Sequence, residues 1–176
     1  MAALPIIYYP DESLRKKCKR VKTVDPQVMK LIHDLAETMY ANRGVGLAAS
    51  QVGVNRRVIV VHAHQDEEQG TSPLIGLVNP EIIEKSEEQE IAEEGCLSIP
   101  GVRGDVVRSL QIIVEGLDVN GEPIRLETNG LEARVLQHEI DHLDGVLFVD
   151  YMDGLTREAV LKEYLEQKEG TDNETT

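Results

Sequence analysis

Apolar residues recur every three or four positions along three stretches of the chain, which predicts three amphipathic helices. The first covers residues 26–42. Two residues favour a helix start there, because Asp25 can act as N-cap and Pro26 occupies the first helical position. The second covers residues 131–143 and ends before Gly145. The third covers about residues 156–168.

Shorter apolar or alternating runs, separated by glycine, proline and polar residues, predict the strands. The clearest are the run Arg57–Ala63 and the alternating run Leu110–Val119, which the turn Asn120-Gly121 joins to a return strand at Pro123–Glu127. Four weaker segments complete the set: an arm or strand at Ile6–Tyr9, a strand at Leu74–Val78 closed by Asn79-Pro80, an exposed ribbon at Ile82–Ile91, and a short strand at Cys96–Ile99 ended by Pro100-Gly101. Helices and strands in these numbers indicate the α+β class.

The length of 176 residues fits one domain, which we place at residues 1–168. Residues 169–176 form an acidic tail without apolar side chains to bury, so we expect this tail to be disordered. Aromatic residues make up only 3% of the chain, with one Phe and no Trp. The core is therefore expected to consist of aliphatic side chains.

The charge of the chain is strongly negative, since 18 Lys and Arg against 32 Asp and Glu give a net charge of −14. Such a surface repels nucleic acid and anionic membranes, so neither DNA nor membrane binding is expected. The two cysteines form no C-x-x-C pair, and Cys18 is expected to be a small buried residue. No apolar run is long enough to span a membrane. We therefore expect a cytoplasmic protein, or one in an organelle matrix or stroma whose leader has been removed.

The second predicted helix contains an H-E-x-x-H motif, His138 to His142. Histidines four residues apart lie on the same helix face, so both imidazoles can bind one ion. They also continue an apolar stripe through Leu131 and Val135, which predicts that both rings point into the protein. Two core histidines with backbone partners are the alternative, but Glu139 between two histidines at ligand spacing favours a metal site.

Two histidines are one protein ligand short of a catalytic metal site, which uses three. Cys96 is one candidate, because a thiolate suits a divalent transition metal. The rival is a carboxylate of the third helix, Glu163 or Glu166. The cysteine would give a Cys-His-His hydrolase, and the glutamate an H-E-x-x-H zinc endopeptidase. A non-catalytic structural site closed by His62 or His64 is a further alternative.

Three segments resemble, in the same order, the signature motifs of the peptide deformylase family: Gly44–Gln51 (GVGLAASQ), Glu94–Ser98 (EGCLS) and Gln137–Leu143 (QHEIDHL). The resemblance implies small mixed or antiparallel sheets packed around a central helix that carries H-E-x-x-H, with a C-terminal helix. It also implies a metal-dependent hydrolase that removes the formyl group from the N-terminal formyl-methionine of nascent polypeptides and releases formate. On this basis the third metal ligand is Cys96.

The resemblance assigns roles residue by residue. The implied metal ligands are Cys96, His138 and His142. Glu139 would be the general base and acid, while the Gln51 amide and the backbone N–H of Leu97 would polarise the formyl oxygen. The residues implied to bind substrate are Val45, Gly46, Gly95, Arg103, Leu131 and Val135. The last two would help to line the pocket for methionine.

The resemblance also implies one divalent metal per chain, with Fe²⁺ as the native ion and Zn²⁺, Ni²⁺ or Co²⁺ as substitutes in a purified sample. The expected partners are N-formylmethionyl peptides and nascent chains. We expect a monomer with at most weak or transient ribosome contact, because the third helix and the tail are acidic. Arg134 departs from some relatives, which carry an apolar residue at this position near the methionine pocket.

Overall fold

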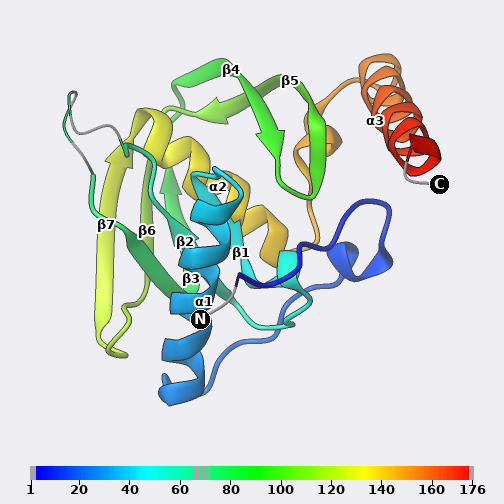
Figure 1. Cartoon of the computed structure of the whole chain (residues 1–176). Helices are drawn as coiled ribbons and strands as arrows, with labels where there is room; N and C mark the ends of the chain where they lie inside the picture. The colour runs from blue at the N-terminus through cyan, green and yellow to red at the C-terminus, as the bar shows by residue number, and fades with distance from the viewer. Residues whose placement is uncertain (1–2, 66–67, 69, 71, 175–176) are drawn as a thin grey trace.

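The computed structural model describes residues 3–65, 68, 70 and 72–174. The predicted α+β class is confirmed, with helices and strands arranged as in Figure 1. In chain order the elements are η1 (Glu12–Arg15), α1 (Pro26–Ala41), β1 (Gly46–Ala48), η2 (Ala49–Val52), β2 (Val58–Val61), β3 (Ile75–Lys85), β4 (Gln89–Cys96), β5 (Ile99–Ser109), β6 (Gln111–Leu117), β7 (Pro123–Asn129), α2 (Gly130–Leu143), η3 (Phe148–Tyr151) and α3 (Gly154–Glu174).

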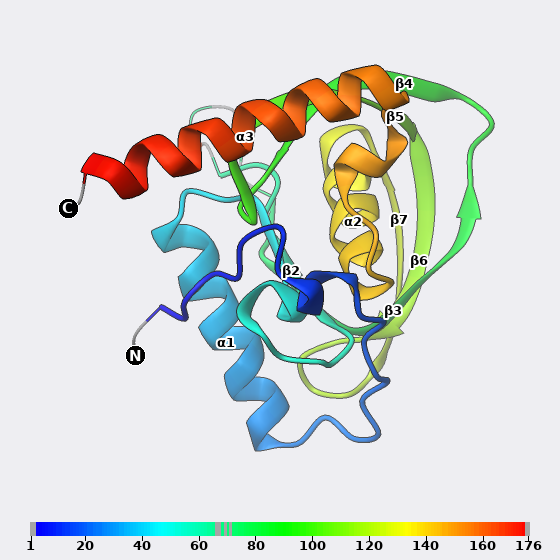
Figure 2. The same ribbon diagram turned by 90° about the vertical axis from the view of Figure 1, so that its right-hand side faces the viewer.

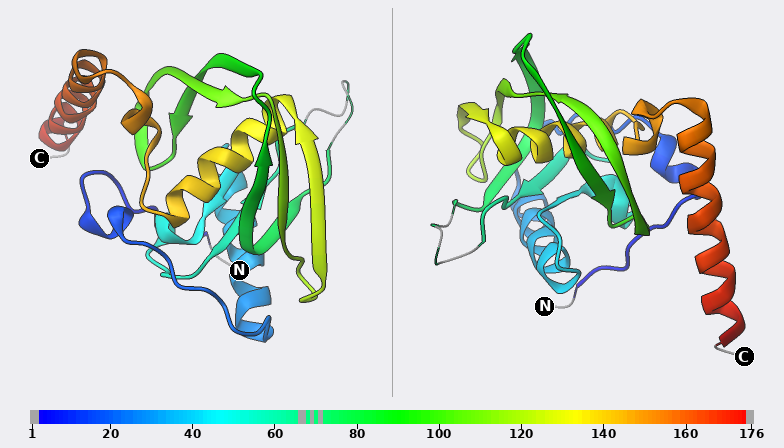
Figure 3. Two further views of the ribbon diagram at one scale, coloured as in Figure 1. Left: turned by 180° about the vertical axis from the view of Figure 1, so that it is seen from behind. Right: turned by 90° about the horizontal axis from the view of Figure 1, so that it is seen from above.

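The strands form two separate antiparallel sheets. Five of them pair in the order β1-β2-β3-β6-β7, and β4 pairs only with β5. Helix α2 lies between the sheets, since it packs against β1 and β2 of the larger sheet and against β5 of the smaller one (Figure 3). The predicted central helix is therefore confirmed, and it is the element that both sheets share.

The strand β2 is covered on both faces, which explains its unbroken run of apolar residues. Val58 and Val60 belong to a core cluster with α1, while Ile59 and Val61 belong to a cluster with α2. Successive side chains of a strand point to opposite faces, so one strand can serve both layers. Helix α1 begins as predicted, because the side chain of Asp25 accepts a hydrogen bond from the backbone N–H of Val28 at 2.9 Å.

A third core cluster joins the smaller sheet to the C-terminal part of the chain. Its fully buried members include Ile99 of β5 and Phe148 of η3, and Tyr164 of α3 packs with them. The Tyr164 hydroxyl donates to the backbone oxygen of Tyr9 at 2.8 Å, which ties the N-terminal arm to α3. Figure 2 shows α3 crossing the top of the molecule, with its C-terminal end projecting away from the body.

Helix α3 is longer than the sequence predicted. It continues to Glu174, so the expected end near residue 168 is wrong and residues 169–174 are helical rather than a disordered tail. Residues 175–176 of that expected tail lie outside the described residues. The projecting turns carry polar side chains all round, and a pattern without an apolar stripe gave no sign that the helix continues. The domain boundary at residue 168 stays a prediction.

Two strand boundaries also differ from the predictions. β3 does not stop at Asn79-Pro80 but continues to Lys85, with a register shift between Val78 and Glu81. Asn79 takes a positive φ of 52° there, and its side chain bonds both the N–H and the C=O of Val21 at 2.8 and 2.9 Å. A β-bulge of this kind accommodates the proline, so the predicted strand Leu74–Val78 continues as one bent strand to Lys85. The predicted ribbon Ile82–Ile91 is therefore wrong as a single element, because its first residues belong to β3 and its last residues, from Gln89, to β4.

The predicted strand at Cys96–Ile99 is also wrong, because the two residues belong to different strands. Cys96 ends β4, Ile99 begins β5, and the two pair across a turn. β5 then continues through Pro100-Gly101, which the sequence analysis took for its end. Gly101 adopts a φ of 82°, a conformation that suits glycine, so the strand can bend there without ending.

Asp150 anchors the segment between α2 and α3, and we expect it to make stability pH-dependent. Burial alone would raise the pKa of Asp150, but hydrogen bonds from Arg15 and from the N–H of Leu147 lower the pKa below its usual range. A lowered folded-state pKa contributes stability above the unfolded value near 3.9 and loses it as the pH falls through the folded value.

Asp150→Asn is therefore expected to cost about 1 kcal/mol of unfolding free energy at pH 7, because the ion pair with Arg15 is partly exposed. Urea unfolding at pH 7 and pH 3 measures the effect. The difference between variant and wild type should shrink at the lower pH, and an equal difference at both would contradict this role. Asp105→Asn, at an exposed aspartate of β5, is the matched control.

Candidate metal centre

The C-terminal half of α2 and the end of β4 bring the three predicted ligands together. His138 Nε2 lies 3.2 Å from His142 Nε2, and His142 Nε2 lies 3.4 Å from Cys96 Sγ. The three ligand atoms all lie within 4.8 Å of one another. Within the described ranges of the chain, no other group of three or more His, Cys, Asp or Glu residues is arranged in this way.

This donor set fits a divalent transition metal. Tetrahedral coordination at usual zinc bond lengths places two nitrogens about 3.3 Å apart and a nitrogen and a sulfur about 3.6 Å apart. The observed separations are close to both values. Burial lowers the pKa of His142, which keeps this imidazole in the neutral form that metals bind. Three protein ligands are also the number found in catalytic zinc sites.

The buried carboxylate of Glu94 orients one of the ligands. Its Oε1 accepts a hydrogen bond from His138 Nδ1 at 2.9 Å, so the Nε2 atom of that ring is left to face the ligand cluster. Burial alone would raise the pKa of Glu94, but hydrogen bonds from Arg108 and His138 hold it well below its usual range. Glu94 is therefore an anion at neutral pH and fixes the tautomer of His138.

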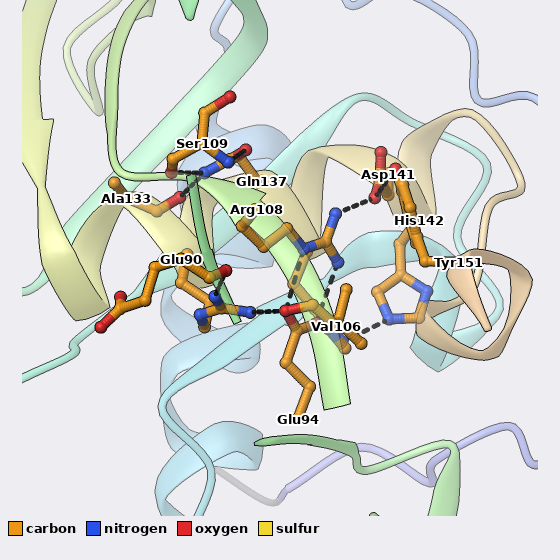
Figure 4. A network of polar contacts seen from close by, with 12 residues as sticks. Glu90, Glu94, Val106, Arg108, Ser109, Ala133, Gln137, Asp141, His142 and Tyr151 are labelled. Atoms are coloured by element: carbon orange, nitrogen blue, oxygen red, sulfur yellow. Dashed lines mark hydrogen bonds and ion pairs between the residues drawn. The ribbon is translucent and has the colours of Figure 1, made fainter. Parts of the chain in front are cut away.

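Arg108 of β5 connects this carboxylate to the helix that carries the histidines (Figure 4). Its Nε and Nη2 atoms each donate to Glu94 at 2.9 Å, and its Nη1 donates to Asp141 of α2 at 2.6 Å. Asp141 also accepts from the Tyr151 hydroxyl at 2.7 Å, and the Arg108 guanidinium lies 4.5 Å from the centre of the Tyr151 ring. Arg108 could not be predicted from the sequence, because the pattern gave no strand over residues 102–109, whereas Glu94 and Asp141 stand inside two of the motifs.

Gln51 reaches the cluster from η2. Its side chain is buried, and its Oε1 accepts a hydrogen bond from the N–H of Ala48 at 2.9 Å. The amide nitrogen is thereby turned toward Cys96 Sγ, 3.6 Å away, and donates to Ser98 Oγ at 3.1 Å. Gln51 thus presents N–H groups beside the metal ligands.

Glu139 stands next to the ligands without belonging to them. Burial raises its pKa to about 7, against the opposing charge of His138. Within the described part of the chain, its Oε2 is buried without a hydrogen-bond partner. A carboxyl group with these properties can take up and return a proton near neutral pH, which is what general acid–base catalysis requires.

A cavity of about 620 Å³ opens beside the cluster. It is lined by every residue to which the sequence analysis gave a role in catalysis or substrate binding: Gln51, Leu97, Glu139, Val45, Gly46, Gly95, Arg103, Leu131 and Val135. Cys96 and His138 contribute to its wall, whereas His142 is buried beneath it. One prediction is corrected: Leu131 was placed on an apolar stripe that points into the protein, but it is 44% exposed and lies at the cavity.

Two glycines keep this cavity open. A Cβ atom added to Gly46 would lie 2.7 Å from Glu139 Oε1 and from Val135 Cγ1. A Cβ added to Gly95 would lie 2.8 Å from the Arg103 guanidinium. The buried side chains of Val135 and Glu139 cannot easily move, which explains why glycine stands at position 46. The exposed Arg103 side chain can shift, so a side chain at position 95 would cost less.

The alternative ligands do not reach the cluster. Glu163 and Glu166 are exposed on α3, and Glu163 accepts a hydrogen bond from Gln167. His62 Nδ1 lies 2.6 Å from the Tyr40 hydroxyl, and His64 is exposed. The endopeptidase ligand set and the closed structural site are therefore wrong for this chain. Cys18 is buried in the core, as predicted.

A Cys-His-His ligand set, a buried glutamate beside it and an adjoining cavity define the site of a metal-dependent hydrolase. Residues 3–158 match the family model described as polypeptide deformylase. A peptide deformylase of Chromohalobacter salexigens is 49% identical over 162 residues, which cover 92% of this chain and 93% of that protein. The chain belongs to the polypeptide deformylase family.

Solved structures agree with this assignment. The crystal structure of a peptide deformylase from Ehrlichia chaffeensis matches with a TM-score of 0.90 and 38% identity, covering 97% of this chain and 99% of that chain. A peptide deformylase of Acinetobacter baumannii, solved with Met-Ala-Ser bound, matches with a TM-score of 0.81 and 34% identity, covering 86% and 99%. In the described residues of this chain, no helix is both long and apolar enough to cross a membrane.

Proposed function

We propose that this chain removes the formyl group from N-formylmethionyl peptides and releases formate, with Glu139 as the group that moves the proton. The observation that carries the proposal is the ligand cluster of Cys96, His138 and His142 with Glu139 beside it, at the wall of one cavity. The reaction is hydrolysis of an amide, so it needs an activated water, a proton donor for the leaving amine and stabilisation of a carbonyl oxygen.

The three ligands would hold the divalent ion. When bound, such an ion lowers the pKa of water and polarises a carbonyl oxygen, which makes a nucleophile available near neutral pH. The orientation of His138 depends on Glu94, as described above. We propose Fe²⁺ as the native ion, since the resemblance implies it, with Zn²⁺, Ni²⁺ or Co²⁺ as substitutes.

Glu139 would accept a proton from the attacking water and return it to the amine that leaves. A pKa of about 7 supports both halves of this cycle, because neither the acid nor the base form is strongly disfavoured near neutral pH. The absence of a side chain at Gly46 lets β1 lie directly against the Glu139 carboxylate, so a substrate beside β1 would be close to this group.

The formyl oxygen would be met by the amide of Gln51 and the backbone N–H of Leu97, which follows Cys96 directly. The hydrogen bond from Ala48 fixes the Gln51 amide in advance, and donors held ready in this way stabilise an oxyanion most effectively.

The peptide backbone would lie along Val45 and Gly46. β1 pairs only with β2, so it is an edge strand of the larger sheet and can accept an extended peptide. The methionine side chain would contact Leu131 and Val135, which line the cavity. Gly95 would also lie along the peptide backbone. Arg103, which is paired with Glu93 at 2.8 Å, would lie near the residues that follow methionine. We further propose that the chain acts as a monomeric single domain in the cytoplasm, with at most weak ribosome contact.

Formate release from formyl-Met-Ala-Ser, with acetyl-Met-Ala-Ser as the control peptide, tests the function. The metal-loaded protein is expected to release formate from the formylated peptide and to leave the acetylated peptide intact. A loaded protein that releases no formate would overturn the proposal.

The proposed iron has an expected consequence of its own. Oxygen oxidises ferrous iron and, with it, the cysteine thiolate that binds the iron, whereas Zn²⁺ has no redox chemistry. Iron-loaded protein should therefore lose activity during aeration without reductant, while the zinc-loaded form should not. Formate release followed over hours of aeration measures the difference. Iron-loaded protein that keeps full activity would contradict the expectation.

A further inference from the structure

We propose that Arg134 is a positioning residue that sets the place of Cys96 relative to the two histidine ligands. The inference rests on the metal site of the proposed function, but not on the identity of the substrate. The sequence placed Arg134 near the methionine pocket. In the structure Arg134 lines the cavity together with Leu131 and Val135, and its guanidinium is bonded to the smaller sheet.

The side chain of Arg134 is buried and its guanidinium donates to three acceptors. Nη1 donates to Glu94 Oε2 at 2.7 Å and to the backbone oxygen of Val106 at 2.8 Å. Nη2 donates to the backbone oxygen of Glu90 at 2.7 Å. Arg134 lies on α2 one turn before His138, so these bonds join the histidine helix to both β4 and β5.

This link matters because of how the ligands are distributed. Both histidines belong to α2, which packs on the larger sheet, whereas Cys96 ends β4 of the smaller sheet. The backbone joins the two sheets near the start of β4, where the N–H of Leu110 donates to Glu88 and the N–H of Ser86 donates to Gln111, both at 2.9 Å. Cys96 lies at the opposite end of β4, so side chains help to set its separation from the histidines there, and Arg134 contacts β4 two residues before Cys96, at Glu94.

Charge balance gives a second reason. The buried carboxylate of Glu94 has two guanidinium partners, Arg108 and Arg134. Arg108 also forms an ion pair with Asp141, so without Arg134 a single arginine would be paired with both carboxylates, Glu94 and Asp141. A buried charge that loses a partner is costly, and the structure around it is expected to shift to recover water or another donor. Glu94 would then hold His138 less firmly.

Arginine suits this position better than lysine would. Its planar fork can bond several acceptors at once, whereas an ammonium group is a point charge on a flexible stem. Arg134→Lys should therefore keep the charge but lose part of the geometry, and Arg134→Leu should lose both.

The test measures metal binding rather than turnover. In chelator competition, Arg134→Leu is expected to bind Zn²⁺ about 10–100-fold more weakly than wild type, the usual effect of removing support behind metal ligands. The Zn²⁺ affinity of Arg134→Lys should lie between that of wild type and that of Arg134→Leu. With Co²⁺ bound, the thiolate-to-cobalt absorption should weaken in the same order, because that band reports the contact between Cys96 and the ion.

Leu35→Ala is the matched control, since Leu35 is fully buried in the core but lies on α1, which carries neither Arg134 nor any of the metal ligands. It should lower stability and leave Zn²⁺ affinity and the cobalt spectrum as in wild type. If Arg134→Leu does not fold, Arg134→Lys alone decides. Wild-type affinity and spectrum in the arginine variants, or an equal loss in Leu35→Ala, would overturn the proposal. Absence of formate release by the wild type would overturn the proposed function and leave this result standing.

Discussion

Glu139→Gln is expected to lower kcat for formate release by about 10²–10⁴ while the metal stays bound. The substitution keeps the size of the side chain and removes its ability to take up a proton. Glu139 is not a ligand, so the positions of Cys96, His138 and His142 should be unchanged. Steady-state kinetics on formyl-Met-Ala-Ser and metal analysis of the same sample measure both quantities.

Glu132→Gln provides the control for this experiment. It makes the same chemical change on the same helix, at a residue that bonds Thr128 and does not line the cavity. Its kcat should stay within about threefold of wild type. If Glu139→Gln were as active as Glu132→Gln, the proton-transfer role of Glu139 would be wrong. If Glu139→Gln lost its metal as well, its low activity would reflect the missing metal and would say nothing about proton transfer.

Cys96→Ser is expected to remove the metal and, with it, more than about 10³ of the activity. A serine hydroxyl is a far weaker ligand than a thiolate for a divalent transition metal. The two histidines that remain do not make up the three ligands of a catalytic site. Metal content after dialysis and formate release are the measurements.

Thermal unfolding with added Zn²⁺ gives a second readout of Cys96→Ser. A ligand that binds only the folded state raises Tm, so zinc should stabilise the wild type and leave this variant almost unchanged. Cys18→Ser is the matched control, because Cys18 is buried away from the cluster and should keep the zinc response. One tightly bound metal per chain in Cys96→Ser would show that sulfur is not a ligand.

The fold was predictable where a pattern is local. The helical spacing in α1 and α2 and the hairpin from β6 to β7 each depend on residues close together in the chain, and the structure confirms all three elements. The long strand β3 was divided wrongly at Asn79-Pro80, and β5 was missed beyond Pro100-Gly101. Proline and glycine usually end a strand, and only the pairing partner shows that here they bend it.

The ligand set was predictable in part for the same reason. His138 and His142 stand one helical turn apart, so the sequence alone places them side by side. Cys96 lies in a distant segment, and the residues by themselves left it in competition with Glu163 and Glu166. The resemblance to a family favoured the cysteine, and the distances in the folded chain decide for it.

The sequence by itself determined the class of fold, the helix that carries the metal and the three motifs from which the site is made. Only the tertiary structure decided how that site is held. Glu94 and Arg108 come from two strands of the smaller sheet and Arg134 from the helix between the sheets, and no periodicity relates them. A buried charge is stable only when it is paired, and here the partners of each charge are distant in sequence. Only the folded chain brings these partners together, so the roles of the three residues could not be predicted from the sequence.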